Sequence, residues 1–369
     1  MIYLDYGATT PIDEEVLQKY IEVSKTFFAN PNSLHKLGQE SNYMFDVAVN
    51  EIKNILRLKN HEIVFTANAT EANNLAIFGI VEKHKSGKII TTKIEHPSVY
   101  NVMKSLEDRF NVIYLDIDEN GLVDLNQLEK ELTKDTILVS IMWVNNIIGT
   151  IQKIGKVIDL VKKYPKAKLH VDAVQGLCKI EPNFDLNDVD IFTFSSHKFY
   201  GPKGIGGLIF KKEIEFAKRL YGASNQFNIK PGTISLPLIV ATAKAFQKFY
   251  PSAKEHYEYV KMLNLYLREQ LEKNENLVIN TPKENVSYYV LNLSFPNING
   301  ETIVHTLEQD NIYVSTGSAC SSKLKRPERT VFELTKDENR ASKSIRVTLS
   351  HLTTKEEIDA LLLSINRIR

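Results

Sequence analysis

The first residue that could do chemistry is a lysine between an apolar segment and a glycine-rich turn. Lys198 follows residues 190–196, which read DIFTFSS, and precedes residues 201–207, which read GPKGIGG; Ser195 and His197 stand close beside it. A lone lysine in a loop is usually a solvated charge. A lysine that directly follows a buried strand can instead be desolvated, which favours a neutral, nucleophilic amine. This placement favours a lysine that forms a Schiff base with a carbonyl ligand.

A carboxylate follows another apolar segment in the same way. Asp172 ends the segment 168–172, and Gln175 lies one turn further on. An isolated Asp in such a place usually caps a helix. If the ligand is a pyridinium ring, however, the carboxylate would keep the ring nitrogen protonated and make the ring an electron sink. Ligands of open α/β sheets bind at the carboxyl ends of strands, so we expect Asp172 and Lys198 to face one cleft.

Two predicted helix starts could bind other parts of the same ligand. Residues 66–76 read TANATEANNLA, and the N–H groups around Ala69 and Thr70 would form an anion site suited to a phosphate. An ordinary N-cap with Glu71 in the first turn is the alternative, and both interpretations can hold together. His96 precedes Pro97, which suits the first turn of a helix. His96 is either a solvated loop residue or a ring that stacks on a planar ligand.

The two cysteines differ in their surroundings. Cys320 lies in residues 315–322, STGSACSS, without an apolar neighbour other than alanine, whereas Cys178 lies in the segment GLCKIEP. Small polar neighbours favour an accessible thiol, so Cys320 is either a nucleophile or inert, with neither alternative excluded. Cys178 is expected to be a buried small hydrophobe.

An arginine inside a predicted strand is the last candidate. Arg346 alternates with Ile345 and Val347 in residues 344–350. Such an arginine can pair with an internal acid, but a bidentate clamp on a substrate carboxylate is the sharper hypothesis. Together these residues fit pyridoxal phosphate (PLP) chemistry on an amino acid, with a thiol as a second nucleophile.

These side chains need a scaffold, and the sequence predicts an α/β fold. Between residues 60 and 215, β-rich segments at 62–66, 88–92, 111–116, 137–144, 168–172, 190–196 and 206–210 alternate with helical ones. This alternation is typical of a mainly parallel sheet covered on both faces. After residue 250 a long helical stretch, 252–273, precedes strands at 288–295 and 344–350 and a helix capped near Thr353, which predicts a smaller α+β unit.

Composition sets the class of protein. The 369 residues are 43% hydrophobic and 25% charged, which is typical of a globular chain. A length of 369 residues predicts two domains at roughly 100–200 residues each. The net charge of +1 gives no global basic field for nucleic acid. No apolar run reaches the roughly 18 residues of a membrane helix. Without a signal peptide or a disulfide framework, we expect a cytoplasmic protein.

Several stretches carry a resemblance to a known family. NPNSLHKLG, EIVFTANATEANNLAI, VNNIIG, HVDAVQ, SSHKFYGPKGIGGL and STGSACSS occur in order, between YLDYGATTP near the start and IRVTLS near the end. With them the chain resembles the cysteine desulfurases of the NifS/IscS group, among the class V aminotransferase-like, fold-type-I PLP enzymes. The resemblance implies a large domain over residues 14–252 with a mainly parallel central sheet. It also implies a small α+β domain made of residues 1–13 and 253–369.

The resemblance also implies a role for each matching residue. Lys198 would hold PLP, Asp172 would pair with its ring nitrogen and Gln175 with its ring hydroxyl. His96 would stack on the ring and shuttle protons, Arg346 would clamp the substrate carboxylate, and Cys320 would take the sulfur. Asn146 would contact cofactor or substrate, and Thr233 would contact the phosphate across a dimer interface. The phosphate would be bound by Ala69, Thr70, Ser195 and His197.

The implied reaction converts L-cysteine to L-alanine and leaves a persulfide on Cys320. The implied partners are a second copy of the chain and a sulfur-acceptor protein, either an iron–sulfur scaffold or a tRNA-thiolation enzyme. Direct contact with nucleic acid, a membrane or a metal is not expected. The alternatives are a PLP-retaining paralogue that is weakly active or partner-dependent, and a lyase for selenocysteine or cysteine sulfinate.

The chain departs from the family pattern near the expected dimer interface and active-site entrance. Residues 222–233 read GASNQFNIKPGT where the family usually has GGGQE…R…GT. Further differences are Asn68, Ile147 and the segment 349–351, LSH. These changes bear on turnover, interface and partner choice more than on reaction type.

Overall fold

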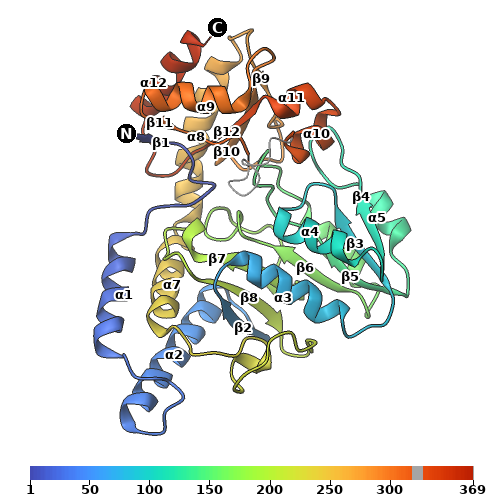
Figure 1. Cartoon of the computed structure of the whole chain (residues 1–369), viewed down its shortest axis with the longest axis vertical. Helices are drawn as coiled ribbons and strands as arrows, with labels where there is room; N and C mark the ends of the chain where they lie inside the picture. Colours follow the sequence, from blue (N-terminus) through green and yellow to red (C-terminus); the bar gives the residue numbers. More distant parts are fainter. Residues whose placement is uncertain (318–326, 369) are drawn as a thin grey trace.

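A computed structural model describes residues 1–317 and 327–368 of the chain, and its largest element is a seven-stranded sheet (Figure 1). The strand order is β2-β8-β7-β6-β5-β3-β4. Strands β4, β3, β5, β6 and β7 run parallel, and β8 is antiparallel to both β7 and β2. The prediction of a mainly parallel sheet is thus confirmed. The strands are β2 (His61–Thr66), β3 (Lys88–Thr92), β4 (Asn111–Leu115), β5 (Thr136–Ser140), β6 (Lys168–Asp172), β7 (Ile191–Ser195) and β8 (Gly206–Lys211).

Strand β5 is shorter than the predicted strand 137–144. It ends at Ser140, but Ile141 N still donates to His170 O at 3.1 Å and Trp143 N to Asp172 O at 2.9 Å. The backbone then turns at Asn145, whose side-chain oxygen accepts from two following N–H groups. Residues 141–143 of the predicted strand therefore still form hydrogen bonds with β6, and the chain leaves the sheet only at this turn.

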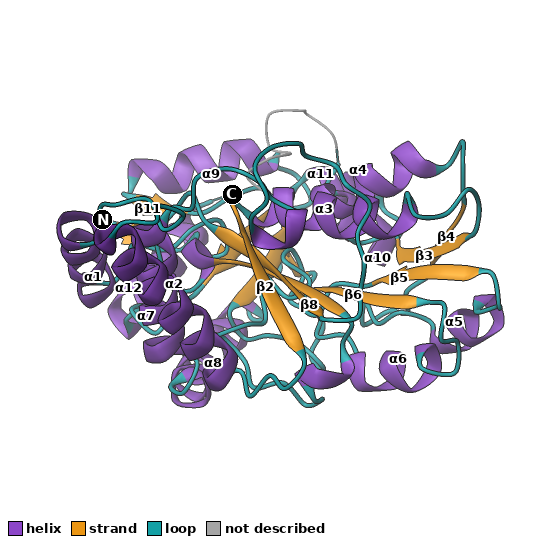
Figure 2. Cartoon of the chain, turned by 90° about the horizontal axis from the view of Figure 1, so that it is seen from below, coloured by secondary structure: helices purple, strands orange, loops and turns teal. Residues whose placement is uncertain are grey.

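Helices cover both faces of the sheet. Successive apolar side chains of a strand point to opposite faces, so both faces have to be buried. Ile63 and Phe65 pack in one buried cluster, and Val64 in another. The first cluster contains residues of α1 (Glu14–Thr26), α2 (Lys36–Ile55), α5 (Leu125–Glu131), α6 (Ile154–Val161) and α7 (Leu236–Phe249). The second contains residues of α3 (Ala69–Val81) and α4 (Pro97–Leu106). Figure 2 shows α3 and α4 on one side of the strands and α5 and α6 on the other.

A second unit lies at the opposite end of the molecule from α2 (Figure 1). It contains the antiparallel sheet β12-β10-β9 and the parallel pair β1-β11. Its own core runs from Val260 to Ile368 and includes Leu4. This core supports the predicted domain division at residues 13/14 and 252/253, which stays a prediction. The elements are β1 (Ile2–Tyr3), α8 (Ala253–Leu271), β9 (Val278–Ile279), β10 (Val290–Ser294), α9 (Gly300–Gln309), β11 (Ile312–Tyr313), α10 (Arg329–Thr335), α11 (Glu338–Ser342), β12 (Ser344–Thr348) and α12 (Lys355–Arg367).

The predicted cap of the last helix is confirmed, one residue after Thr353. The Thr354 side chain accepts from Glu357 N, and the Glu357 carboxylate accepts from Thr354 N, which is a capping box. Within the described ranges, each helix is too short or too polar to cross a membrane.

A tight contact under Trp143 gives a first prediction. A Cβ on Gly176 would lie 2.2 Å from Trp143 Cε3, so the indole would have to shift. The indole is buried and packs edge-on against Phe184. We expect Gly176→Ala to lower the free energy of unfolding by about 1–3 kcal/mol, measured by urea denaturation. Gly155→Ala is the control, because its Cβ would meet only ordinary contacts at 3.7 Å or more. Equal stability of the two variants would contradict the prediction.

Candidate active site

The carboxyl ends of β6 and β7 border a cavity of about 170 Å³. Ten of the residues singled out in the sequence line this single cavity: Ala69, Thr70, His96, Asn146, Asp172, Gln175, Ser195, His197, Lys198 and Arg346. The expectation that Asp172 and Lys198 face one cleft is therefore confirmed.

Lys198 reaches into this cavity from the short 3-10 turn that follows β7. Its ammonium donates to Gly7 O at 2.7 Å and to Ala8 O at 2.8 Å. Both carbonyls belong to the loop after β1, which is held by the hydrogen bond from Gly7 N to Thr348 Oγ1 at 2.8 Å. The nucleophile candidate is thus positioned by a loop from the other unit of the molecule.

Asp172 is buried at the end of β6, and its carboxylate accepts two hydrogen bonds. Oδ2 accepts from Asn73 Nδ2 at 2.9 Å and Oδ1 from Val174 N at 3.1 Å. Burial raises the pKa of Asp172, while these hydrogen bonds and Lys198 act in the opposite direction. A cationic N–H in the cavity would stabilise the carboxylate, so the site suits a protonated ring nitrogen.

Asn73 connects Asp172 to His96, a link that the sequence analysis missed. Asn73 Nδ2 also donates to Ser98 Oγ at 2.9 Å, and Ser98 Oγ lies 2.8 Å from His96 Nδ1. Thr193 Oγ1 donates to Asn73 Oδ1 at 2.6 Å, which fixes the orientation of the amide. The available signal was a polar residue on the sheet-facing side of a largely apolar helix, α3.

His96 is the N-cap of α4 and is neutral. Burial lowers its pKa to about 4, with further lowering by the cations Lys198, Arg329 and Arg346. Its Nδ1 accepts from Ser98 N at 3.1 Å, so the hydrogen of the neutral ring is on Nε2. The neutral ring can therefore stack on a planar ligand without bringing a charge into the cavity. A proton taken up by the ring would create a cation, which burial and the nearby cations disfavour.

The start of α3 and the end of β7 form a cradle that suits a phosphate. Asn68 caps α3 by accepting from Glu71 N at 2.9 Å, and the first N–H groups of a helix have no intrahelical partner. Ser195 Oγ is buried and has no hydrogen-bond partner in the described residues. A Cβ on Gly206 would lie 3.0 Å from Ala69 N, so the glycine lets β8 approach this helix start. Together with Asp172 and Lys198, these groups fit PLP. The N-cap interpretation of this segment is confirmed, and phosphate binding there stays a prediction.

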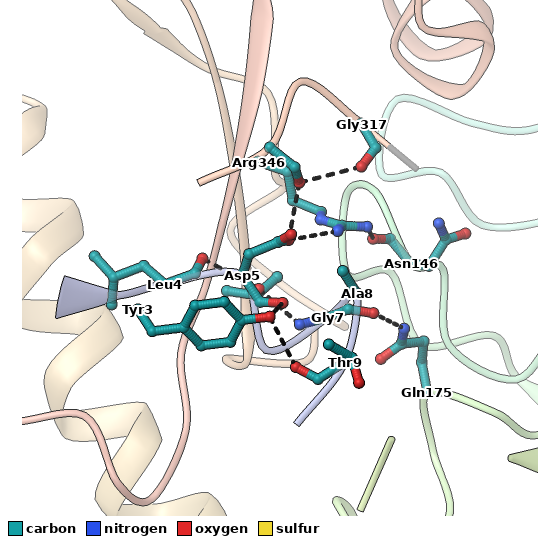
Figure 3. Close-up of polar contacts among 12 residues, drawn as sticks. Tyr3, Leu4, Asp5, Gly7, Ala8, Thr9, Asn146, Gln175, Gly317 and Arg346 are labelled. Atoms are coloured by element: carbon teal, nitrogen blue, oxygen red, sulfur yellow. Dashed lines mark hydrogen bonds and ion pairs between the residues drawn. The ribbon is translucent and has the colours of Figure 1, made fainter. Parts of the chain in front are cut away.

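Arg346 is paired with an internal acid. Its Nη2 lies 2.8 Å from Asp5 Oδ1, and its Nη1 donates to Asn146 O at 3.0 Å (Figure 3). Ser315 Oγ donates to the same Asp5 oxygen at 2.9 Å. The internal-acid alternative is thus realised. Arg346 Nε is buried without a partner in the described part of the chain, and clamping of a substrate carboxylate stays a prediction.

Of the residues expected to bind cofactor or substrate, one does not line this cavity. Thr233 is exposed, precedes α7 and is not among the lining residues. Its proposed contact with a partner's phosphate stays a prediction. Cys320 lies outside the described residues.

A lysine and an acid after neighbouring parallel strands, with an anion site at a helix start, define a fold-type-I PLP enzyme. The chain matches the aminotransferase class-V family model over residues 2–361. It is 37% identical to a cysteine desulfurase, IscS, of Dictyoglomus turgidum, covering 100% of this chain and 94% of the relative. A solved NifS-like protein has a TM-score of 0.92 at 35% identity, with 100% and 98% of the two chains covered. SspA in complex with cysteine has a TM-score of 0.81 at 28% identity, with 96% and 100% covered. The chain belongs to the class-V aminotransferase family, and within it to the PLP-dependent cysteine desulfurases.

The ion pair of Arg346 gives a stability prediction. Arg346 is 1% exposed, so removal of its acid leaves a buried cation with one fewer partner. We expect Asp5→Ala to lower the free energy of unfolding by about 3 kcal/mol in urea denaturation. Asp159→Ala removes an exposed ion pair with Lys162 and should leave the free energy of unfolding nearly unchanged. A loss no larger for Asp5→Ala than for Asp159→Ala would contradict the prediction.

Glu95 gives a pH prediction. Burial raises its pKa to about 8, although Oε1 accepts from Met142 N at 3.0 Å and from Thr92 Oγ1 at 2.8 Å. From its ordinary value of 4.5 up to about 8, the unfolded chain loses this proton while the folded chain keeps it. The stability contribution of Glu95 is therefore present below pH 4.5 and is lost as the pH rises toward 8.

Glu95→Gln cannot titrate at this position. As the pH rises from 5 to 8, the free energy of unfolding of this variant should therefore increase relative to that of the unsubstituted protein. The expected gain is up to about 1.4 kcal/mol per pH unit. Urea denaturation of both proteins across this range measures it, and a difference that does not change with pH would refute the prediction.

Proposed function

We propose that Lys198 carries PLP, that L-cysteine binds beside it, and that Cys320 accepts the substrate sulfur. The observation that carries the proposal is the meeting of Lys198, the buried Asp172 and the orphan Ser195 hydroxyl around one cavity. When bound, PLP supplies an electron sink for an amino acid attached to it. The Lys198 amine moves the α-proton of the substrate, and the neutral His96 stacks on the ring. Arg346 and Asn146 hold the substrate carboxylate.

The sulfur step needs no external oxidant. The Cys320 thiolate attacks the substrate sulfur, an S–S bond forms and the C–S bond breaks. The electron pair of the C–S bond stays with the carbon, which takes a proton and leaves as L-alanine. The substrate carbon is reduced while the Cys320 sulfur is oxidised to a persulfide, so atoms and electrons balance.

The described residues on either side of Cys320 support this assignment. Gly317 lies against Glu328, since a Cβ on Gly317 would be 2.6 Å from Glu328 Oε2. Ser315 is tied to Asp5, which pairs with Arg346 at the cavity. Two residues separate Gly317 from Cys320 in the sequence, so three peptide steps of at most about 11 Å join them. The last described residue before Cys320, Gly317, accepts a hydrogen bond from Ser315 Oγ at 3.2 Å, beside the Asp5–Arg346 pair.

The proposal includes a homodimer in which Thr233 contacts the phosphate bound by the partner subunit. It also includes a sulfur-acceptor protein, either an iron–sulfur scaffold or a tRNA-thiolation enzyme. The altered segment 222–233 keeps a link to the phosphate cradle: Lys230 pairs with Glu71 of α3 at 2.9 Å. Turnover of the unsubstituted protein separates an active enzyme from a scaffold whose altered loop blocks catalysis.

The test separates the two nucleophiles. Cys320→Ser should keep PLP and its yellow colour but lose alanine and sulfide release, because a serine hydroxyl cannot accept sulfur as a persulfide. Borohydride reduction and peptide mapping should place the cofactor on Lys198 in both proteins, and mass mapping after incubation with cysteine should place the extra sulfur on Cys320.

Cys178→Ser is the matched control. Burial raises the pKa of Cys178 far above its ordinary value, so this thiol is not a nucleophile. The variant should lose about 1–3 kcal/mol of stability and still form the persulfide on Cys320. Extra sulfur on Cys178, or full turnover by Cys320→Ser, would overturn the proposal.

A further inference from the structure

One buried cation next to the cavity has no role in the proposed reaction. Lys179 is 6% exposed and is absent from the cavity lining. Its Nζ donates to Gln175 Oε1 at 2.7 Å. In the described residues no carboxylate pairs with Lys179, so its charge is stabilised chiefly by this amide. Removing a lysine ammonium from water is unfavourable, and a position that retains one calls for an explanation.

The surroundings of Lys179 hold it in place. Lys179 and Gln175 are four residues apart in a helical turn, where Lys179 N donates to Gly176 O at 3.1 Å. The ammonium lies over the ring of Tyr289, 5.8 Å from its centroid. Burial and the cations Lys198 and Arg346 lower the pKa of Lys179 to about 7, while Cys178 acts in the opposite direction. Both the charged and the neutral amine have N–H groups that can donate to Oε1.

Two contacts orient the Gln175 amide: Lys179 at its oxygen end and the Gly7 carbonyl at its nitrogen end. The two ends of an amide have nearly the same shape but opposite hydrogen-bonding character. An ammonium has only donors, so Oε1 must turn toward Lys179. Nε2 then turns the other way, and it donates to Gly7 O at 2.9 Å (Figure 3). An amide nitrogen has two hydrogens, so a second one remains for an acceptor in the cavity.

We propose that Lys179 is a positioning residue that makes Gln175 present a hydrogen-bond donor to the ring oxygen of the cofactor. The inference rests on the proposed PLP site. A donor stabilises an anionic ring oxygen, with the proton on the nitrogen shared by Lys198 and the cofactor. A reversed amide would present an acceptor and stabilise a protonated ring oxygen. Lys179 thus selects the charge distribution of the bound cofactor without touching it.

The two charge distributions absorb differently, which gives a readout besides activity. The form with an anionic ring oxygen and a protonated nitrogen is yellow, and the form with a protonated ring oxygen absorbs in the near ultraviolet. In Lys179→Met holoenzyme the ratio of the near-ultraviolet form to the yellow form should rise about fivefold, the equivalent of one hydrogen bond of about 1 kcal/mol. Lys179→Gln should change the ratio in the same direction, because its side chain is one bond shorter and loses the direct contact. If Lys179→Met does not fold, the Lys179→Gln variant provides the test in its place.

Two controls separate positioning from a general effect of charge or stability. Lys88→Met removes another largely buried, hydrogen-bonded lysine, paired with Glu131 at the far end of β3, and should leave the ratio unchanged. In a Gln175→Leu background the further change Lys179→Met should have no effect on the ratio, because the residue acts through Gln175. An unchanged ratio in folded Lys179→Met holoenzyme, or a further shift in the Gln175→Leu background, would overturn the inference. Failure of the unsubstituted protein to bind PLP on Lys198 would instead overturn the proposed function.

Discussion

The backbone carbonyl of Gly7 is the contact on which the arrangement of the site depends. It accepts from Lys198 at the end of β7 and from Gln175 after β6, and the N–H of the same residue donates to Thr348 of β12. Glycine is required here because a Cβ would lie 2.8 Å from Thr348 Cγ2. One residue therefore joins the edge of the large sheet to the smaller unit. The cavity exists only where these two parts meet.

The charges around the cavity come from both parts of the molecule. Lys198 comes from the large sheet, and the largely buried Arg346 from β12. Asp172 lines the cavity together with Lys198 and accepts a hydrogen bond from Asn73, and Asp5 pairs with Arg346. Cations and orphan N–H groups gathered in a site of low dielectric favour a ligand with a phosphate and a carboxylate. Neutral His96 and His197 line the same site without adding charge, because burial lowers the pKa of each to about 4.

The departures from the family pattern lie at the margins of this arrangement. Gln226 stands where the family has an acid, and its amide oxygen accepts from Phe65 N at 2.7 Å on the edge strand β2. Phe227 has φ of 59° and packs against Phe210. Asn68, where glycine is common, has φ of −171°, an extended conformation that any residue adopts, and it serves as the cap of α3. The substitutions thus build different local contacts and leave the residues around Lys198 and Asp172 in place.

The sequence by itself determined the class of fold and the identity of the reactive groups. Strand and helix periodicity is local, so the apolar segments before Asp172 and Lys198 predicted two strand ends of one sheet. Local patterns singled out nine of the ten residues that line one cavity, and the resemblance added Asn146. Local patterns did not reveal Asn73, which donates to Asp172 across 99 residues of sequence, or the bond of Lys198 to Gly7 across 191. They also left open whether Arg346 pairs with an acid or binds substrate, and its partner Asp5 is 341 residues away. Only the tertiary structure decided these contacts, because a buried polar group takes whichever partner the folded loops bring within hydrogen-bond distance, and hydrophobic periodicity carries no information about that partner.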